Sequence, residues 1–478
     1  MKANKSILLL VLLFCSIVCF GKSVSKNGYK NNPTNTVDNS SIRITDFFEA
    51  GKIIDPVICK ADPSQSYALY IPLKGNSQDL PVIYFFDPHG KGSFPLNKYR
   101  SLADEYGFIF IASNNSKNGT DWSTTGNIIT TLFNDSQKRL KIEHSRIYTC
   151  GFSGGAKVAS YAALDRDDVC GVIVGGAGLP DGIAAANFNF TYTILSGNGD
   201  MNMTDLVALD NDLNKTQTEH RIIFFDGRHE WPPATIMDIA FTGLQFDAMR
   251  WRIIPVNEVF IHNYIVNSKN KLTDFFNKNK LVEANDECEL SVNMLNNLTK
   301  EIDWFKQKEM SINTSHSFQQ QLKVKAGLMQ QEQDLKNYYE QQFQKGDKLF
   351  WIKTISELQS KAKIQNAESA MYQRLLAYLS LAFYSISNRF INANQNNEAQ
   401  YFVGLYKLDD PTNSDAWYFS AILNARNNNT KATKEDLLKA VDNGFTDKIR
   451  MLQQPEFKSL SAQINFPEIE KKIDSKMY

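Results

Sequence analysis

A serine between glycines is the feature of this sequence that points most directly to chemistry. The segment Gly151–Gly155 (GFSGG) fits the pattern G-x-S-x-G, after the predicted strand Arg146–Cys150 and before a helical run that ends near Leu164. In such a setting the serine occupies a sharp turn, which exposes its oxygen at the sheet edge. The glycines let neighbouring backbones approach without a Cβ between them. The pattern therefore predicts that Ser153 is a nucleophile; a plain tight turn is the other interpretation.

A nucleophilic serine needs a base and a carboxylate that orients this base. Both residue types follow later predicted strands: Asp200 comes shortly after Thr191–Ser196, and His229 comes shortly after Arg221–Phe225. Because the carboxyl ends of parallel strands meet at one edge of a sheet, we expect Ser153, Asp200 and His229 to lie together there.

Other carboxylates and histidines fit these two roles less well. Asp205 is expected inside the next helix, and Asp226 is too close to the loop that carries His229. His89 lies in the loop after an early buried strand, where it suits a role in a pocket. The other histidines precede strands or lie in the helical half of the chain: His144, His220, His262 and His316.

The oxyanion that forms in such a reaction needs two N–H groups that point to one position. Gly154 should supply the first, since it follows the nucleophile and opens a helix whose N-terminus favours negative charge. The second should come from the loop Asp87–Gly92 (DPHGKG), with Gly90 or Lys91 as the expected donor. A simple Pro/Gly turn is the alternative interpretation of this loop.

The elements that would position these groups are short strands that alternate with helical stretches from about Ile42 to Arg250. Pro81–Phe86 (PVIYFF) is a continuous apolar run, typical of a parallel strand buried on both faces. The alternation predicts a mainly parallel sheet with helices on both faces. After Arg250 the strand-like runs cease and apolar residues recur at helical spacing. The expected fold class is therefore α/β, followed by an all-α region.

The order of these motifs resembles the α/β-hydrolase fold. The segment His229–Pro233 (HEWPP) is similar to the histidine loop of secreted esterases of the polyhydroxybutyrate-depolymerase-like and feruloyl-esterase-like kind. This resemblance covers about residues 42–250. It implies a serine esterase with Ser153, Asp200 and His229 as its triad. One departure is the sequence Asp87–Gly90 (DPHG), where the family more often has an apolar residue before its His-Gly pair.

The substrate pocket is expected to include His89 and Trp122, and the resemblance implies that Trp231 lines it as well. The connection Gly175–Asn187 is short and rich in glycine and alanine, where lipases often insert a lid. An open pocket suited to a bulky or polymer-attached ester is the resulting hypothesis. The mechanism requires no organic cofactor and no metal.

Composition excludes several classes of protein. Lysine and arginine together number 52 and aspartate and glutamate 52, so the net charge is zero over 478 residues. We therefore expect no nucleic-acid partner held by phosphate contacts. The mean hydropathy of −0.35 argues against a multi-span membrane protein, and no transmembrane anchor is expected. Outside the predicted signal peptide, the four cysteines Cys59, Cys150, Cys170 and Cys288 lack metal-ligand spacing, so no zinc site is predicted.

The N-terminus predicts export. Lys2 and Lys5 precede the apolar run Ile7–Phe20, which is too short to span a bilayer comfortably but fits a signal peptide. Cleavage before Lys22 would release the chain to the periplasm or the extracellular space. Lipidation at Cys19 is the alternative.

The helical half contains helix-length segments at a spacing of roughly 34 residues. Asp410–Trp417, followed by Ala421 and Ala425, resembles the tetratricopeptide pattern, in which a proline ends one helix and small residues let the next helices pack closely. Such helices would serve a protein partner. One rival function is therefore a helical interaction scaffold with an inactive hydrolase domain. A second is a serine peptidase of the same fold.

These inferences divide the chain into five segments. They are a signal peptide (1–21), a flexible leader (22–41), an α/β-hydrolase domain (42–250), a helical region (251–365) and a tetratricopeptide-like helical domain (366–478).

Overall fold

The computed structural model describes residues 48–73, 79–364, 366–460 and 463–477. The predicted signal peptide, the leader and the lipidation candidate Cys19 lie outside the described residues. Within those residues, no helix combines the length and the apolar character needed to cross a membrane.

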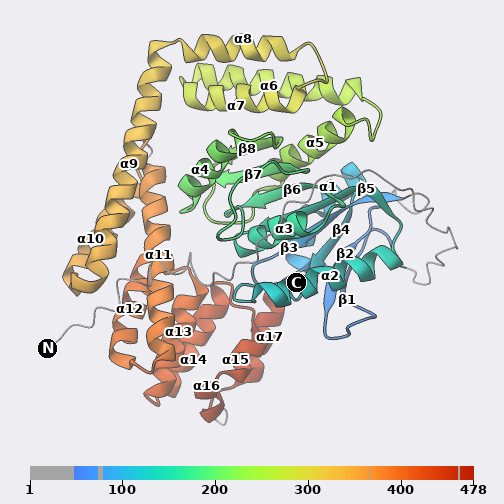
Figure 1. Cartoon of the computed structure of the whole chain (residues 1–478). Helices are drawn as coiled ribbons and strands as arrows, with labels where there is room; N and C mark the ends of the chain where they lie inside the picture. The colour runs from blue at the N-terminus through green and yellow to red at the C-terminus, as the bar shows by residue number, and fades with distance from the viewer. Residues whose placement is uncertain (1–47, 74–78, 365, 461–462, 478) are drawn as a thin grey trace. The chain divides into compact units, whose positions relative to one another are not determined.

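An eight-stranded sheet forms the centre of the N-terminal half (Figure 1), in the spatial order β1-β2-β4-β3-β5-β6-β7-β8. All neighbouring strands from β4 to β8 pair in parallel, whereas β2 runs antiparallel to both β1 and β4. This confirms the mainly parallel sheet. The strands are β1 Ile53–Ile58, β2 Ser66–Tyr70, β3 Leu80–Phe86, β4 Ile109–Ser113, β5 Ile142–Phe152, β6 Val169–Gly175, β7 Thr191–Gly197 and β8 His220–Phe225.

Helices cover both faces of this sheet, as the apolar run in β3 predicts. Alternate residues of β3 enter two separate cores: Phe85 packs with helices α1 and α5, and Tyr84 packs with α2, α3 and α4. Every residue of β3 is buried, because a strand in the middle of such a sheet has no face toward water. These helices are α1 Ser93–Tyr106, α2 Trp122–Arg139, α3 Gly154–Asp165, α4 Met203–Leu213 and α5 Ala234–Arg250.

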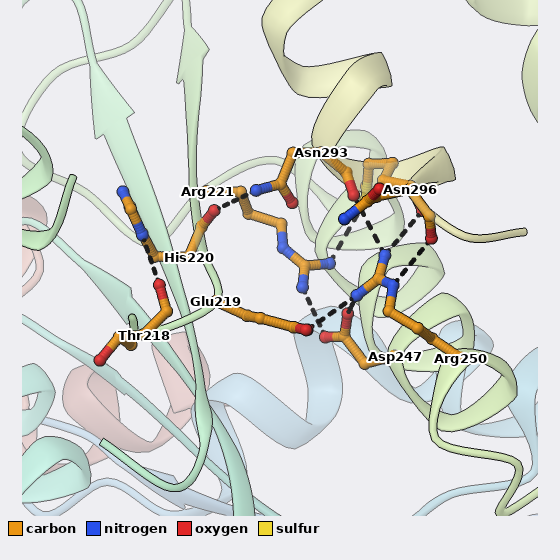
Figure 2. Close-up of polar contacts among 9 residues, drawn as sticks. Thr218, Glu219, His220, Arg221, Asp247, Arg250, Asn293 and Asn296 are labelled. Carbon is orange, nitrogen blue, oxygen red and sulfur yellow. Dashed lines mark hydrogen bonds and ion pairs between the residues drawn. The ribbon is translucent and has the colours of Figure 1, made fainter. Parts of the chain in front are cut away.

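Three further helices, α6 Glu258–Asn277, α7 Leu281–Leu295 and α8 Ile302–Asn313, extend the core that contains α1 and α5. A buried ionic network holds α7 against the start of β8 (Figure 2). Asp247 of α5 accepts hydrogen bonds from Arg221 at 2.5 Å and from Arg250 at 2.8 Å. Arg250 also donates to backbone carbonyls at the C-terminal end of α7, including that of Asn296 at 3.0 Å. A guanidinium at this position offsets the partial negative charge of a helix C-terminus.

The C-terminal half of the described chain is all helical and has a hydrophobic core of its own, which confirms the second part of the expected fold class. Its helices are α9 His316–Lys345, α10 Lys348–Ala362, α11 Ser369–Asn392, α12 Asn396–Asp409, α13 Ser414–Arg426, α14 Thr430–Asp442, α15 Lys448–Gln453, α16 Pro455–Ser459 and α17 Phe466–Met477. The resemblance of this half to tetratricopeptide repeats stays a prediction.

The chain divides into two compact units, one reaching Ala326 and the other beginning at Gly327, so the division falls inside α9. The changes of sequence character at 250/251 and 365/366 do not coincide with this division. Helices α6 to α8 contribute Ile261, Cys288 and Phe305 to the core of the sheet unit, which explains why that unit continues beyond residue 250. The predicted domain boundaries stay predictions.

Candidate active site

Ser153 lies in the sharp turn between β5 and α3. Its backbone has φ 53° and ψ −124°, a left-handed conformation that is strained for any residue other than glycine. Its N–H donates to the carbonyl of Gly175 in β6 at 2.8 Å, which fixes the turn on the sheet. A Cβ on Gly151 would clash with the backbone of Gly155, and a Cβ on Gly155 would clash with the carbonyl of Phe86. The two outer glycines of the motif are therefore required by close backbone approach.

The structure brings Ser153, His229 and Asp200 within hydrogen-bonding distance of one another. His229 Nε2 lies 3.0 Å from Ser153 Oγ. His229 Nδ1 lies 2.9 and 3.0 Å from the two carboxylate oxygens of Asp200. Asp200 is buried, while the His229 side chain keeps 20% exposure, so the chain of three groups opens to solvent at its serine end. Asp205 lies inside α4, as expected.

The loop after β8, which carries His229, is held by side chains from α1 and from the loop after β3. Lys98 Nζ donates to the carbonyl of Trp231 at 3.0 Å, and Tyr99 donates to the carbonyl of Pro232 at 2.6 Å. Trp231 Nε1 donates to Asp87 at 2.9 Å. These three bonds join segments more than a hundred residues apart, which no local sequence signal could have predicted.

Gly176, the residue after β6, lies against the His229 ring, a contact that sequence reasoning missed. It has φ 68°, and a Cβ there would lie 2.9 Å from Cε1 of His229 and 2.7 Å from Cε2 of Phe152. The Phe152 ring in turn packs against the His229 ring, with centroids 4.8 Å apart. A side chain at 176 would therefore push directly on the imidazole. The glycine pair that ends β6 was the only available signal.

Asp87 organises the loop after β3. Its Oδ1 accepts the backbone N–H of His89 at 2.9 Å and that of Lys91 at 3.3 Å, and its carbonyl accepts the N–H of Gly90 at 3.1 Å. Burial by itself would raise the pKa of Asp87, but hydrogen bonds from His89 and Trp231 outweigh burial and lower it. The carboxylate is thus ionised at neutral pH.

This arrangement disagrees with the expectation that Gly90 or Lys91 supplies an oxyanion donor. Both N–H groups already have acceptors: the Asp87 carboxylate accepts that of Lys91, and the Asp87 backbone carbonyl accepts that of Gly90. Gly154 is different. It is the first residue of α3, and the first N–H groups of a helix have no partner within the helix.

The three expected pocket residues differ in their surroundings. His89 is exposed, with 70% of its side chain accessible. Trp122 is also exposed, and its ring lies tilted against that of Tyr161 with centroids 5.1 Å apart. Tyr161 follows Ser153 by about two helical turns. Trp231 does not line an open surface: it is 5% exposed and packs in the core beside Phe152. Its position in the loop suggested a pocket, but its ring points into the core, where Asp87 accepts its N–H.

The four described cysteines are unpaired; Cys59, Cys150 and Cys288 are buried, and Cys170 is half-buried. Burial raises the pKa of Cys59 to about 11 and that of Cys288 to about 12. These thiols stay protonated at neutral pH, so they do not compete with Ser153 as nucleophiles.

No family model matches the chain, and no curated protein matches it. Solved structures that resemble it include an esterase from Pyrobaculum calidifontis, at 11% identity and a TM-score of 0.34, over 42% of this chain and 85% of the other. A feruloyl esterase module from Clostridium thermocellum resembles it at 11% identity and a TM-score of 0.33, over 43% and 91%. An S-formylglutathione hydrolase from Agrobacterium tumefaciens does so at 16% identity and a TM-score of 0.30, over 39% and 90%. At these values the likenesses carry no argument about activity.

The geometry of the site itself indicates its chemistry. A hydroxyl, an imidazole and a buried carboxylate in one chain of hydrogen bonds can move a proton from the hydroxyl to the imidazole. Ser153 precedes the N-terminus of α3, whose partial positive charge favours an anion formed beside it.

Proposed function

We propose that this protein is a serine hydrolase that cleaves carboxylic esters through an acyl-enzyme intermediate. The observation that carries the proposal is the pair of contacts of His229, with Ser153 Oγ at 3.0 Å on one side and Asp200 at 2.9 Å on the other. The strained backbone of Ser153 supports it, because strain of this kind persists where function requires the geometry.

In the first half of the reaction His229 Nε2 removes the proton of Ser153 as Oγ forms a bond with the ester carbonyl carbon. The carbonyl π electrons move to the oxygen, and Asp200 stabilises the imidazolium and fixes its tautomer. When the tetrahedral intermediate collapses, the C–O bond to the alcohol breaks and His229 protonates the departing alcohol. A water molecule then attacks the acyl-enzyme by the same proton path and releases the acid.

For the substrate, we propose an ester whose acyl or alcohol group is bulky or attached to a polymer. The connection from β6 to β7, residues 176–190, contains no helix or strand, and Ile183 within it is exposed. The proposal is that no helical lid closes over Ser153, so that a large substrate can approach. High activity on emulsified long-chain triglyceride would contradict this part of the proposal.

We further propose that the protein is exported by its N-terminal signal peptide and that its C-terminal helices contact a protein partner. The sequence at Ile7–Phe20 and the tetratricopeptide-like spacing support these two statements. Both are independent of the catalytic proposal.

A substrate panel on the purified chain tests the catalytic proposal. Short p-nitrophenyl esters, feruloyl and acetyl esters and peptide substrates are compared for the wild type and Ser153→Ala. We expect hydrolysis of esters that falls by about 10⁶-fold in the variant, as for the nucleophile of other serine hydrolases. A fluorophosphonate should label the wild type and not the variant. Ester turnover that survives the substitution would refute the proposal.

A further inference from the structure

The oxyanion site beside Ser153 has only one obvious hydrogen-bond donor. Gly154 offers an N–H at the start of α3, but the loop after β3 turns the N–H groups of His89, Gly90 and Lys91 onto Asp87. Stabilising a tetrahedral oxyanion requires donors from at least two directions. A second donor must therefore come from another segment.

The loop after β4 lies against both Gly154 and the loop after β3. Asn118 donates its backbone N–H to the carbonyl of Pro88 at 2.8 Å, and Lys117 pairs with His89 in a backbone bridge. These contacts fix the loop 114–120 alongside the loop after β3. They put the Asn118 side chain at the sheet edge where Ser153 lies.

The carboxamide of Asn118 rests on Gly154. A Cβ on Gly154 would collide with Oδ1 of Asn118, and it would lie 2.9 Å from Cγ and 3.5 Å from Nδ2. Asn118 is exposed, and among the residues that the structure describes no hydrogen bond engages its carboxamide. Glycine at position 154 therefore makes room for an amide that is otherwise uncommitted.

We propose that Asn118 is a catalytic residue that supplies the second oxyanion donor through its side-chain amide. A half-turn about the Cβ–Cγ bond exchanges Oδ1 and Nδ2, so the NH₂ end can face the oxygen when negative charge develops. The oxyanion then accepts one hydrogen bond from Gly154 N–H and one from Asn118 Nδ2. Asn118 thus replaces the N–H groups of the loop after β3, which donate to Asp87 instead. This inference rests on the proposed ester hydrolysis.

The consequence is a specific kinetic effect. A neutral ester carbonyl gains little from a second donor, whereas an oxyanion gains much, so the contact lowers the transition state more than the bound substrate. Removing one such donor in other serine hydrolases lowers kcat by about 10²–10³-fold. We expect Asn118→Ala to lower kcat by about 10²-fold, with KM within about twofold of the wild type.

The experiment compares the full-length wild type with Asn118→Ala, Asn118→Asp and the neighbouring exposed control Lys117→Ala. The measurements are kcat and KM on a short p-nitrophenyl ester, the second-order rate of fluorophosphonate labelling, and the midpoint of thermal unfolding. Asn118→Asp should be at least as slow as Asn118→Ala, since a carboxylate donates no hydrogen bond and repels the oxyanion. Labelling should slow with hydrolysis, and the midpoint should stay unchanged.

Two results would overturn the role of Asn118 while ester hydrolysis stands. One is an Asn118→Ala variant whose kcat stays within threefold of the wild type. The other is a loss of kcat that a raised KM and a lowered unfolding midpoint accompany, which would indicate a structural role. A wild type that neither hydrolyses any ester of the panel nor reacts with the fluorophosphonate overturns both proposals.

Discussion

The two ends of strand β8 carry polar groups with opposite characters. At its start, Arg221 and Asp247 form an ion pair whose side chains are 1% and 0% exposed, and Arg250 ties this pair to α7 (Figure 2). After its end, His229 joins the buried Asp200 to the partly exposed Ser153. One network is closed within the protein, and the other ends in a hydroxyl that a substrate can reach.

The two networks have different effects on the stability of the fold. Buried charges are tolerated only when partners satisfy them, so the first network fixes how α5 and α7 pack on the sheet. The second network keeps a strained serine and an imidazole with one nitrogen directed at it. Strain lowers stability, and it is of use only if the group reacts. The comparison predicts that substitutions at one end change activity and those at the other change folding.

After Ser153→Ala, the largest effect is expected from Asp200→Asn. An amide cannot hold the imidazole in the tautomer that accepts the serine proton, so kcat should fall by about 10⁴-fold with the unfolding midpoint nearly unchanged. Steady-state kinetics on a short ester measures this. Asp205→Asn is the matched control, because Asp205 follows the same strand but lies in α4. Equal losses in both variants would contradict the assignment of Asp200.

At the other end of β8, Asp247→Ala should lower the free energy of unfolding by about 3–5 kcal/mol, because it leaves Arg221 buried beside no carboxylate. Activity per folded molecule should persist. Urea unfolding and kinetics on the same samples separate the two quantities. Asp274→Ala, which breaks an exposed pair with Lys278, should change stability by less than about 0.5 kcal/mol. If Asp247→Ala has the same free energy of unfolding as the wild type, the two ends of β8 do not differ in the way described.

Gly176→Ala tests the end of β8 that carries His229. The added Cβ would press on His229, and displacement of a catalytic group by about 1 Å can lower the rate about 10²-fold. Gly182→Ala is the matched control: Gly182 also has a positive φ, of 80°, but no heavy atom lies within 4 Å of its added Cβ. Both variants should lose some stability, and only Gly176→Ala should lose kcat. Equal activity in the two would show that crowding of the imidazole is unimportant.

A last effect concerns pH and lies away from both networks. Burial raises the pKa of Asp286 in α7 to about 6, against the opposing charge of Lys325. The unfolded chain therefore loses this proton at a lower pH than the folded protein, which reduces folded stability as pH rises from about 4 to 6. Asp286→Asn should stabilise the protein, with an advantage that grows over this interval and then stays constant. Thermal unfolding from pH 4 to pH 8 measures it; an advantage that shrinks as pH rises would contradict the sign.

Several features follow from local pattern and could be predicted. The apolar run Pro81–Phe86 corresponds to β3, and the helical spacing of apolar residues after Arg250 corresponds to helices such as α11. The position of Ser153, Asp200 and His229 after β5, β7 and β8 also follows from the sequence, because parallel strands bring their carboxyl ends to one edge. Strand β1 was missed, since Asp55 and Pro56 interrupt its apolar pattern.

Other features depend on which segments meet across the fold. Nothing near Trp231 in the sequence indicates that its ring is buried against Phe152, or that Asp87 accepts its N–H. The approach of Asn118 to Gly154 joins loops after different strands. Residue types and their spacing thus determined which groups could react and the edge at which they meet. Only the tertiary structure decided which amides remain free there, because hydrogen bonds between distant segments depend on distances that the local pattern does not contain.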